Sequence, residues 1–181
     1  PGPDEIALKR QFRERSVEKE YLAIVRGRIE ADEQTIALPL RRAPAGLTHL
    51  LMEALIEAPT GDADAGWLEA RTRARVVERR GDRTLVHLFP ETGRQHQLRV
   101  HLAAIGHPIV GDKLYGPEGA AVFLELIETG PTPEILSRRW HRRQSLHAPA
   151  LTLHHPPSGA RMTFRSPLPP DLAELWARSE S

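Results

Sequence analysis

A chain of 181 residues is long enough to bury one sizeable core, and its charge is nearly balanced at +1. It contains no cysteine, which excludes disulfides, cysteine-ligated zinc and thiol catalysis. No apolar run approaches the roughly 20 residues that cross a membrane, and residues 1–10 lack the apolar core of a signal peptide. We therefore expect residues 1–181 to form one cytoplasmic domain, a monomer without a membrane anchor.

The first half of the chain predicts two helices and an edge strand. A helix is expected over about 5–15, after an acidic start. Residues 34–40 suit a short strand at a sheet edge, because Pro39 cannot donate to a neighbouring strand. Residues 46–57 carry leucines at helical spacing, which predicts a second, acidic helix.

Residues 19–25 (KEYLAIV) predict a strand rich in β-forming residues. A period of two places Tyr21 on the same face as Ala23 and Val25. One interpretation is an ordinary core tyrosine. The other is a tyrosine at the mouth of a cleft, where its ring can stack on a ligand and its hydroxyl can form a hydrogen bond.

A pair of strands is predicted next, over 67–79 and 84–89, joined by a tight turn at 80–82. The first strand alternates strictly, with three arginines on one face: Arg71, Arg73 and Arg75. Such a row suits a nucleic-acid backbone, or simply solvent. The second strand is apolar on both faces, which favours a central position in the sheet.

Residues 91–116 (ETGRQHQLRVHLAAIGHPIVGDKLYG) predict a helix that begins after Thr92 and ends at Gly106. Thr92 is the expected N-cap, with Gln95 completing a capping box. An apolar stripe follows the helical period through Leu98, Leu102 and Ile105. This stripe is expected to face the core.

Arg94 lies four residues before Leu98, so the helical period places it on the inward face. A buried guanidinium is costly unless an anion pairs with it. A carboxylate or a phosphate would serve. Glu91 is one candidate partner, and an arginine that reaches out to water is the plainer alternative.

The last third of the chain is basic. Residues 135–170 contain six arginines and no acidic residue. Four arginines flank Trp140 in one run, namely Arg138, Arg139, Arg142 and Arg143. This run is expected either to bind RNA phosphates or to be solvated surface. Residues 117–143 are expected to be a surface insertion, and a hairpin and a final helix are predicted to follow it.

The sequence lacks the motifs of several common kinds of catalytic and metal-binding site. His96 and His101 lie five residues apart, where helical metal ligands lie four apart, so no metal site is expected. Neither glycine-rich phosphate loop occurs, and no GxSxG sequence is present. Two functions are left open by these absences: catalysis by a carboxylate without a cofactor, or binding without catalysis.

The sequence resembles the RluA-type pseudouridine synthases. The likeness rests on residues 93–101 (GRQHQLRVH), 106–109 (GHPI) and 111–116 (GDKLYG). Residues 17–23, the strand containing Arg75, and residues 146–148 match in order and spacing. Together these motifs span about residues 8–172.

The resemblance implies an α+β fold with a mixed, mostly antiparallel sheet flanked by helices. It also implies isomerisation of uridine to pseudouridine in structured RNA, ribosomal or transfer, by an aspartate nucleophile and without cofactor or metal. Tyr21 matches the tyrosine that stacks on the uracil and is implicated in removing the C5 proton. Arg94 matches the arginine that pairs with the aspartate, and Leu98 matches a residue that walls the base pocket.

The family's aspartate belongs to an HRLD-type motif, which is absent from residues 1–181. None of the seven aspartates matches it. We therefore expect the domain to be truncated at its N-terminus and this chain by itself to be inactive. The alternative is an RNA-binding module that has lost catalysis.

Overall fold

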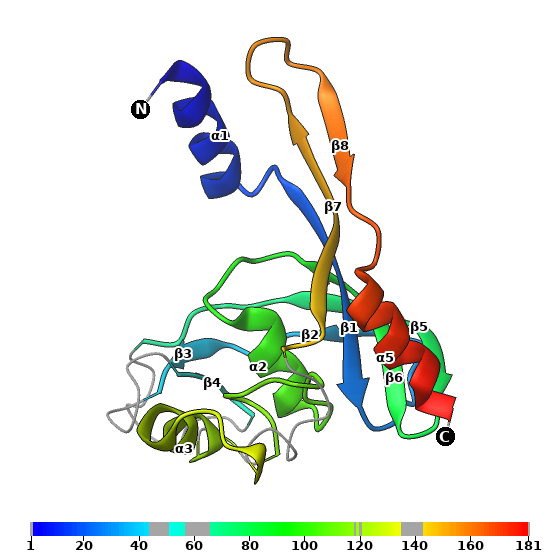
Figure 1. The fold of residues 1–181 in the computed structure, drawn as a ribbon. Helices are drawn as coiled ribbons and strands as arrows, with labels where there is room; N and C mark the ends of the chain where they lie inside the picture. Colours follow the sequence, from blue (N-terminus) through cyan, green and yellow to red (C-terminus); the bar gives the residue numbers. More distant parts are fainter. Residues whose placement is uncertain are drawn as a thin grey trace.

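The computed structural model describes residues 2–43, 51–56, 66–117, 119, 121–134 and 143–180 (Figure 1). Helices and strands follow one another in the order α1 (Pro3–Arg13), β1 (Glu18–Arg26), β2 (Glu33–Ile36), β3 (Leu40–Arg42), β4 (Met52–Ala54), β5 (Thr72–Arg80), β6 (Arg83–Pro90), α2 (Gln97–Ala104), α3 (Ala121–Thr129), β7 (Leu146–His154), β8 (Arg161–Arg165) and α5 (Pro170–Ala177). This arrangement confirms the expected α+β fold with an antiparallel sheet.

Six strands form the main sheet in the order β2-β5-β6-β1-β7-β8, and every neighbouring pair is antiparallel. The strand predicted to be central, β6, lies between β5 and β1. The pairing register sets Tyr21 opposite Leu88 and Arg73 opposite Phe89. Residues paired in this way project from the same face of the sheet, so the register decides which side chains meet.

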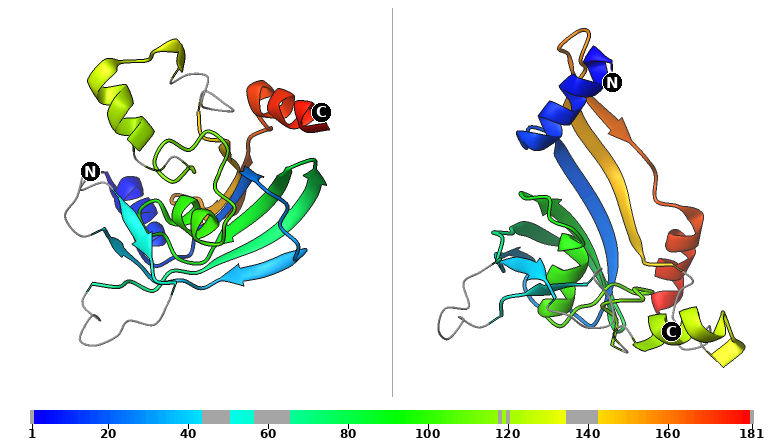
Figure 2. Two further views of the ribbon diagram at one scale, coloured as in Figure 1. Left: turned by 90° about the horizontal axis from the view of Figure 1, so that it is seen from below. Right: turned by 90° about the vertical axis from the view of Figure 1, so that its left-hand side faces the viewer.

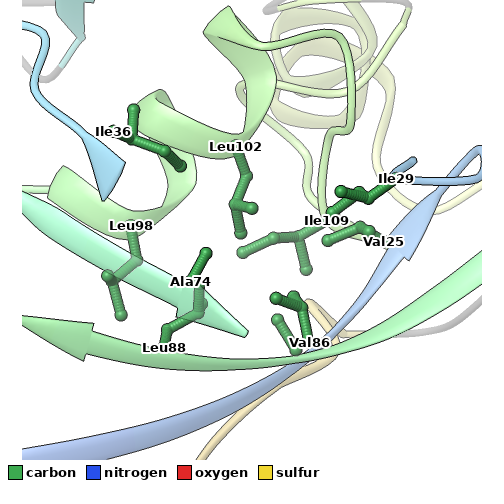
Figure 3. Packing of buried hydrophobic residues seen from close by; sticks show 10 residues of the cluster. Val25, Ile29, Ile36, Ala74, Val86, Leu88, Leu98, Leu102 and Ile109 are labelled. Atoms are coloured by element: carbon green, nitrogen blue, oxygen red, sulfur yellow. The ribbon is translucent and has the colours of Figure 1, made fainter. Parts of the chain in front are cut away.

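Helix α2 covers one face of the sheet, and α5 covers the other. Alternation along β1 explains this, because Ala23 and Val25 pack toward α2 while Ile24 packs toward α5. Figure 3 shows the first cluster, where Leu98 and Leu102 of α2 meet β-strand residues such as Leu88. The apolar stripe predicted for this helix is confirmed.

Helix α1 and the β7–β8 hairpin project from the rest of the molecule (Figures 1 and 2). Contact between them is polar: the Gln11 side chain donates to the carbonyl of His154 at 2.6 Å and accepts from its N–H at 2.8 Å. No residue of α1 is buried, and every residue of β8 is exposed.

The acidic helix predicted over 46–57 is wrong where the structure describes it, because Met52–Ala54 form strand β4. Residues 44–50 and 57–65 lie outside the described residues. Strand β4 pairs with β3, and Met52 is buried beside Val100 of α2. The strand predicted over 34–40 is an edge strand but ends at Ile36, and β3 then starts at Leu40.

Candidate active site

Tyr21 lies near the N-terminal end of β1, on the face that packs against α2. It is half-buried, with its neighbour Leu88 fully enclosed. Burial raises the pKa of the Tyr21 phenol, so the hydroxyl carries its proton at neutral pH. Tyr21 therefore offers both a ring face and a hydrogen-bond donor.

Arg94 lies in the loop that joins β6 to α2, before the helix begins. Helix α2 starts at Gln97, and His96 precedes it with a φ of 54°, in the left-handed region. The prediction that Arg94 occupies the first turn and its inward face is therefore wrong. Its guanidinium is half-exposed, and its Nε donates to the carbonyl of Glu69 at 2.9 Å.

Thr92 is not the N-cap of α2, because its hydroxyl is engaged elsewhere. It accepts from the backbone N–H of Arg71 at 2.9 Å and donates to the side chain of Gln97 at 2.7 Å. One bond reaches Arg71, just before β5, and the other reaches the side chain of the first residue of α2, so the hydroxyl does not accept from a backbone N–H of the helix. Glu91 pairs with Arg71 at 2.9 Å, so it is not the partner of Arg94. Among the described residues, no carboxylate lies within ion-pair distance of Arg94.

Gln97 fixes the loop from inside the protein. It is 4% exposed and uses both ends of its amide. Its oxygen accepts from the Thr92 hydroxyl and, at 3.0 Å, from the backbone N–H of Arg94. Its nitrogen donates at 3.0 Å to the carbonyl of Arg71 and to the hydroxyl of Thr72. The backbone of Arg94 is thus held by a fully bonded, buried amide.

Replacing Gln97 by leucine is expected to lower the free energy of unfolding by about 2–3 kcal/mol, because leucine leaves buried polar partners without a hydrogen bond. Urea denaturation measures the effect. Gln95→Leu is the matched control, since Gln95 is exposed two residues away and a surface change is expected to stay within about 0.5 kcal/mol. Equal losses in the two variants would contradict the role of Gln97.

Tyr21, Arg94 and Leu98 line one pocket of about 180 Å³. The residues named from the family resemblance as the tyrosine, the arginine and the pocket wall thus lie together, although they come from β1, a loop and α2. Arg94 also borders a larger hollow of about 680 Å³ beneath α1 and another of about 570 Å³ beside β3 and β4. It stands where these three spaces meet.

An ion pair that the sequence patterns did not reveal supports α2 from its other side. Arg99 holds Asp112 with two hydrogen bonds of 2.7 Å, and the Asp112 side chain is 0% exposed. Asp112 also accepts from the N–H groups of Leu114 and Tyr115. The Tyr115 hydroxyl accepts from the N–H of Met52 at 2.9 Å. The loop containing Asp112 therefore links α2 to β4.

Three arginines of the predicted basic run lie outside the described residues, namely Arg138, Arg139 and Arg142. Arg143 is described, and it forms a bidentate ion pair with Asp171 at 2.7 and 2.9 Å. Hydrogen bonds from Arg143 to Asp171 raise the pKa of Arg143. RNA binding by this run stays a prediction.

Within the described part of the chain, no group of three or more His, Cys, Asp or Glu side chains is arranged to hold a metal ion. No described helix is both long and apolar enough to span a bilayer.

Comparison with solved structures shows the class of the fold. Human RNA Pseudouridylate Synthase Domain Containing 1 superposes with a TM-score of 0.64 and 31% identity, over 88% of this chain and 58% of that one. Human RNA Pseudouridylate Synthase Domain Containing 4 superposes with a TM-score of 0.72 at 23% identity, over 96% of this chain and 66% of that one, which shows a shared fold. The molecule therefore has the fold of an RNA pseudouridylate synthase domain.

Sequence comparison gives the family. The profile described as RNA pseudouridylate synthase matches residues 6–104, and the chain belongs to this family. The protein named ribosomal large subunit pseudouridine synthase D from Nitrosomonas europaea is 38% identical over 169 residues, which are 93% of this chain and 42% of the relative. The Escherichia coli K12 protein of the same name is 35% identical over 178 residues, 96% of this chain and 48% of the relative. The chain thus spans about half the length of these curated relatives, and the RluA-type resemblance is confirmed.

Proposed function

We propose that the protein isomerises uridine to pseudouridine in RNA through an aspartate nucleophile supplied by residues that precede Pro1. The observation that carries this proposal is the convergence of Tyr21, Arg94 and Leu98 on one pocket. In the family these positions hold the stacking tyrosine, the arginine partner of the aspartate and a wall of the base pocket. Membership of the family supports the same activity.

Each residue has a proposed task in that pocket. The ring of Tyr21 stacks on the flipped uracil, and Leu98 contacts its edge. Arg94 receives the incoming aspartate, because a planar guanidinium can bind both carboxylate oxygens. The aspartate attacks the C1′ carbon of the sugar and the uracil leaves through N1; the uracil turns, and its C5 attacks C1′ and displaces the aspartate. C5 then loses its proton while N1 takes one up, and the Tyr21 hydroxyl is the proposed relay, accepting the C5 proton through its oxygen as its own O–H donates onward.

We propose ribosomal RNA of the large subunit as the substrate, since the similar proteins from Nitrosomonas europaea and Escherichia coli are named ribosomal large subunit pseudouridine synthase D. The Arg138–Arg143 run is proposed to bind RNA phosphates, and its contribution to affinity should fall steeply as the salt concentration rises. An enzyme of this kind is expected in the cytoplasm with its RNA.

The proposed function is tested with the full-length protein and unmodified large-subunit RNA made by transcription. Pseudouridine is detected as a carbodiimide adduct that stops primer extension. The expected result is a new stop at one or a few uridines, with no stop when the 181-residue chain is used by itself. Tight RNA binding without any stop would instead favour an RNA-binding module that has lost catalysis.

Tyr21→Phe is expected to keep RNA affinity within about twofold and to lower turnover by about 10²-fold. Phenylalanine retains the stacking ring but lacks the hydroxyl placed near C5. Single-turnover conversion measures the rate, and filter binding measures affinity. An unchanged rate would show that the ring alone accounts for the tyrosine.

A further inference from the structure

Two arginines of β5 lie on the sheet face opposite α2, next to an aromatic ring. Ala74 pairs with Leu88 on the α2 side, so Arg73 and Arg75 project from the other face. The guanidinium carbon of Arg73 lies 4.5 Å from the ring centroid of Phe89, and that of Arg75 lies 5.9 Å away. A guanidinium stacked on a ring keeps its N–H edge directed outward.

Neither arginine forms an ion pair within the described part of the chain. Both are exposed, and no described carboxylate lies within ion-pair distance of either one, although Glu33 of β2 lies opposite Arg75 in the strand register. The third arginine of the row, Arg71, differs because it pairs with Glu91. The row predicted from the sequence therefore divides into one paired and two unpaired side chains.

The Arg73–Phe89 pair lines a hollow that lies next to the candidate active site. The space of about 680 Å³ beneath α1 is lined by Arg73 and Phe89 at one side and by Gly93 and Arg94 at the other. The pocket that contains Tyr21 shares Lys19, Gly93 and Arg94 with this hollow, so the two spaces adjoin at the loop that precedes α2.

The balance of charge around this hollow is positive. Two of its three acidic side chains pair with arginines, Glu18 with Arg161 and Glu91 with Arg71, while Glu20 lies 3.0 Å from His87 and keeps its negative charge. Five basic side chains also line it, namely Arg13, Arg15, Lys19, Arg73 and Arg94. Burial lowers the pKa of His87, and the charges of Arg75 and Arg73 lower it further against the pull of Glu20. A polyanion is the ligand that this surface suits.

We propose that Arg73, Arg75 and Phe89 form a binding site for the phosphodiester backbone of the RNA strand next to the flipped uridine. Phe89 orients Arg73, and the two guanidinium groups bind successive phosphates. The site deepens the proposed function and rests on it, since the target uridine is taken to occupy the Tyr21 pocket. Its ligand is single-stranded RNA, read by charge and not by sequence.

The test compares full-length wild-type protein with the double variant Arg73→Gln, Arg75→Gln. Binding of a fluorescein-labelled single-stranded oligoribonucleotide is followed by anisotropy at several salt concentrations. The variant is expected to bind about tenfold more weakly near 100 mM salt, and its log–log salt slope should fall by about 1.4, or about 0.7 per lost phosphate contact. Arg28→Gln is the matched control, because Arg28 is exposed beyond the opposite end of β1 and should change neither quantity.

A second variant tests the contribution of the Phe89 ring separately from the two charges. Phe89→Leu leaves both charges in place and removes the ring, so a two- to fivefold loss of affinity is expected with an unchanged salt slope. Circular dichroism checks that each variant is folded. Unchanged affinity and slope in the double arginine variant would overturn the proposal.

Turnover separates this proposal from the proposed function. The double variant should raise KM and leave kcat unchanged, because neither arginine contacts the reacting atoms. If the wild-type protein forms pseudouridine and the double variant binds RNA as tightly as the wild type, the phosphate site is overturned and the proposed function stands. Wild-type protein that neither binds nor converts RNA would overturn both.

Discussion

Replacing Arg94 by alanine in the full-length protein is expected to lower pseudouridine formation by about 10²–10³-fold while the protein stays folded. Arg94 contributes one described side-chain hydrogen bond to the fold, from its Nε to the carbonyl of Glu69. Losing that bond costs about 1 kcal/mol at a half-exposed site. The rest of the guanidinium edge stays available to bind the aspartate, so the loss falls on catalysis.

Two further variants sharpen this result. Arg94→Lys retains the charge but not the planar fork, and we expect it to recover only a small part of the activity. Arg71→Ala is the matched control, because Arg71 is exposed near the same loop and pairs only at the surface with Glu91. Carbodiimide primer extension gives the rates, and thermal denaturation gives stability. Full turnover by Arg94→Ala would remove the role assigned to this arginine.

The strands and the body of α2 could be predicted because their signals are local. Alternation along β5 distinguishes buried Thr72 and Ala74 from exposed Arg73, and the pleat alone produces that pattern. The stripe of Leu98 and Leu102 follows the helical period in the same way. Both patterns hold because each element buries one face against a neighbour.

The start of α2 and strand β4 could not be predicted, because distant partners decide them. Thr92 is a good N-cap by local rules, yet its hydroxyl bonds to the backbone of Arg71, 21 residues earlier. Leucine spacing near Met52 favours a helix, but pairing with β3 and a bond from Met52 N–H to Tyr115 select a strand. In each case a contact across the fold outweighs the local preference.

The candidate site came from family resemblance and not from periodicity. The helical period placed Arg94 on the inward face of a helix, whereas it lies in a loop. The same period gives no reason to separate Gln97, which is buried and fully bonded, from exposed Gln95. Whether Tyr21 faced a cleft was equally undecided, because a core tyrosine shows the same alternation. Only the fold brings these residues to one pocket.

Asp112→Asn is expected to lower the free energy of unfolding by about 3–5 kcal/mol, the range for breaking a buried ion pair. Asparagine fills the same volume and can still accept from the N–H groups of Leu114 and Tyr115. It cannot neutralise Arg99, whose side chain is only 14% exposed. The melting temperature should fall by roughly 6–20 °C, since 1 kcal/mol corresponds to about 2–4 °C at this chain length.

The pH dependence gives an independent measurement of the same pair. Burial by itself would raise the pKa of Asp112, but the hydrogen bonds and charge of Arg99, with two backbone N–H groups, outweigh it and hold the pKa below its ordinary value. A lowered pKa in the folded state means that the stabilisation is complete above the unfolded value of about 3.9 and is lost as pH falls through the folded pKa. Wild-type protein should therefore lose more stability than Asp112→Asn below about pH 4.

Denaturant titrations at a series of pH values make this comparison. Asp82→Asn is the control, because Asp82 is 62% exposed and lies 3.8 Å from Arg83, where a surface pair contributes about 0–1 kcal/mol. Its curve should run parallel to that of the wild type. If the stability of Asp112→Asn also followed pH in parallel with the wild type, the Arg99–Asp112 pair would not be the source of the acid sensitivity. If Asp112→Asn is the only variant whose stability no longer falls below about pH 4, the loop linking α2 to β4 depends on this charge.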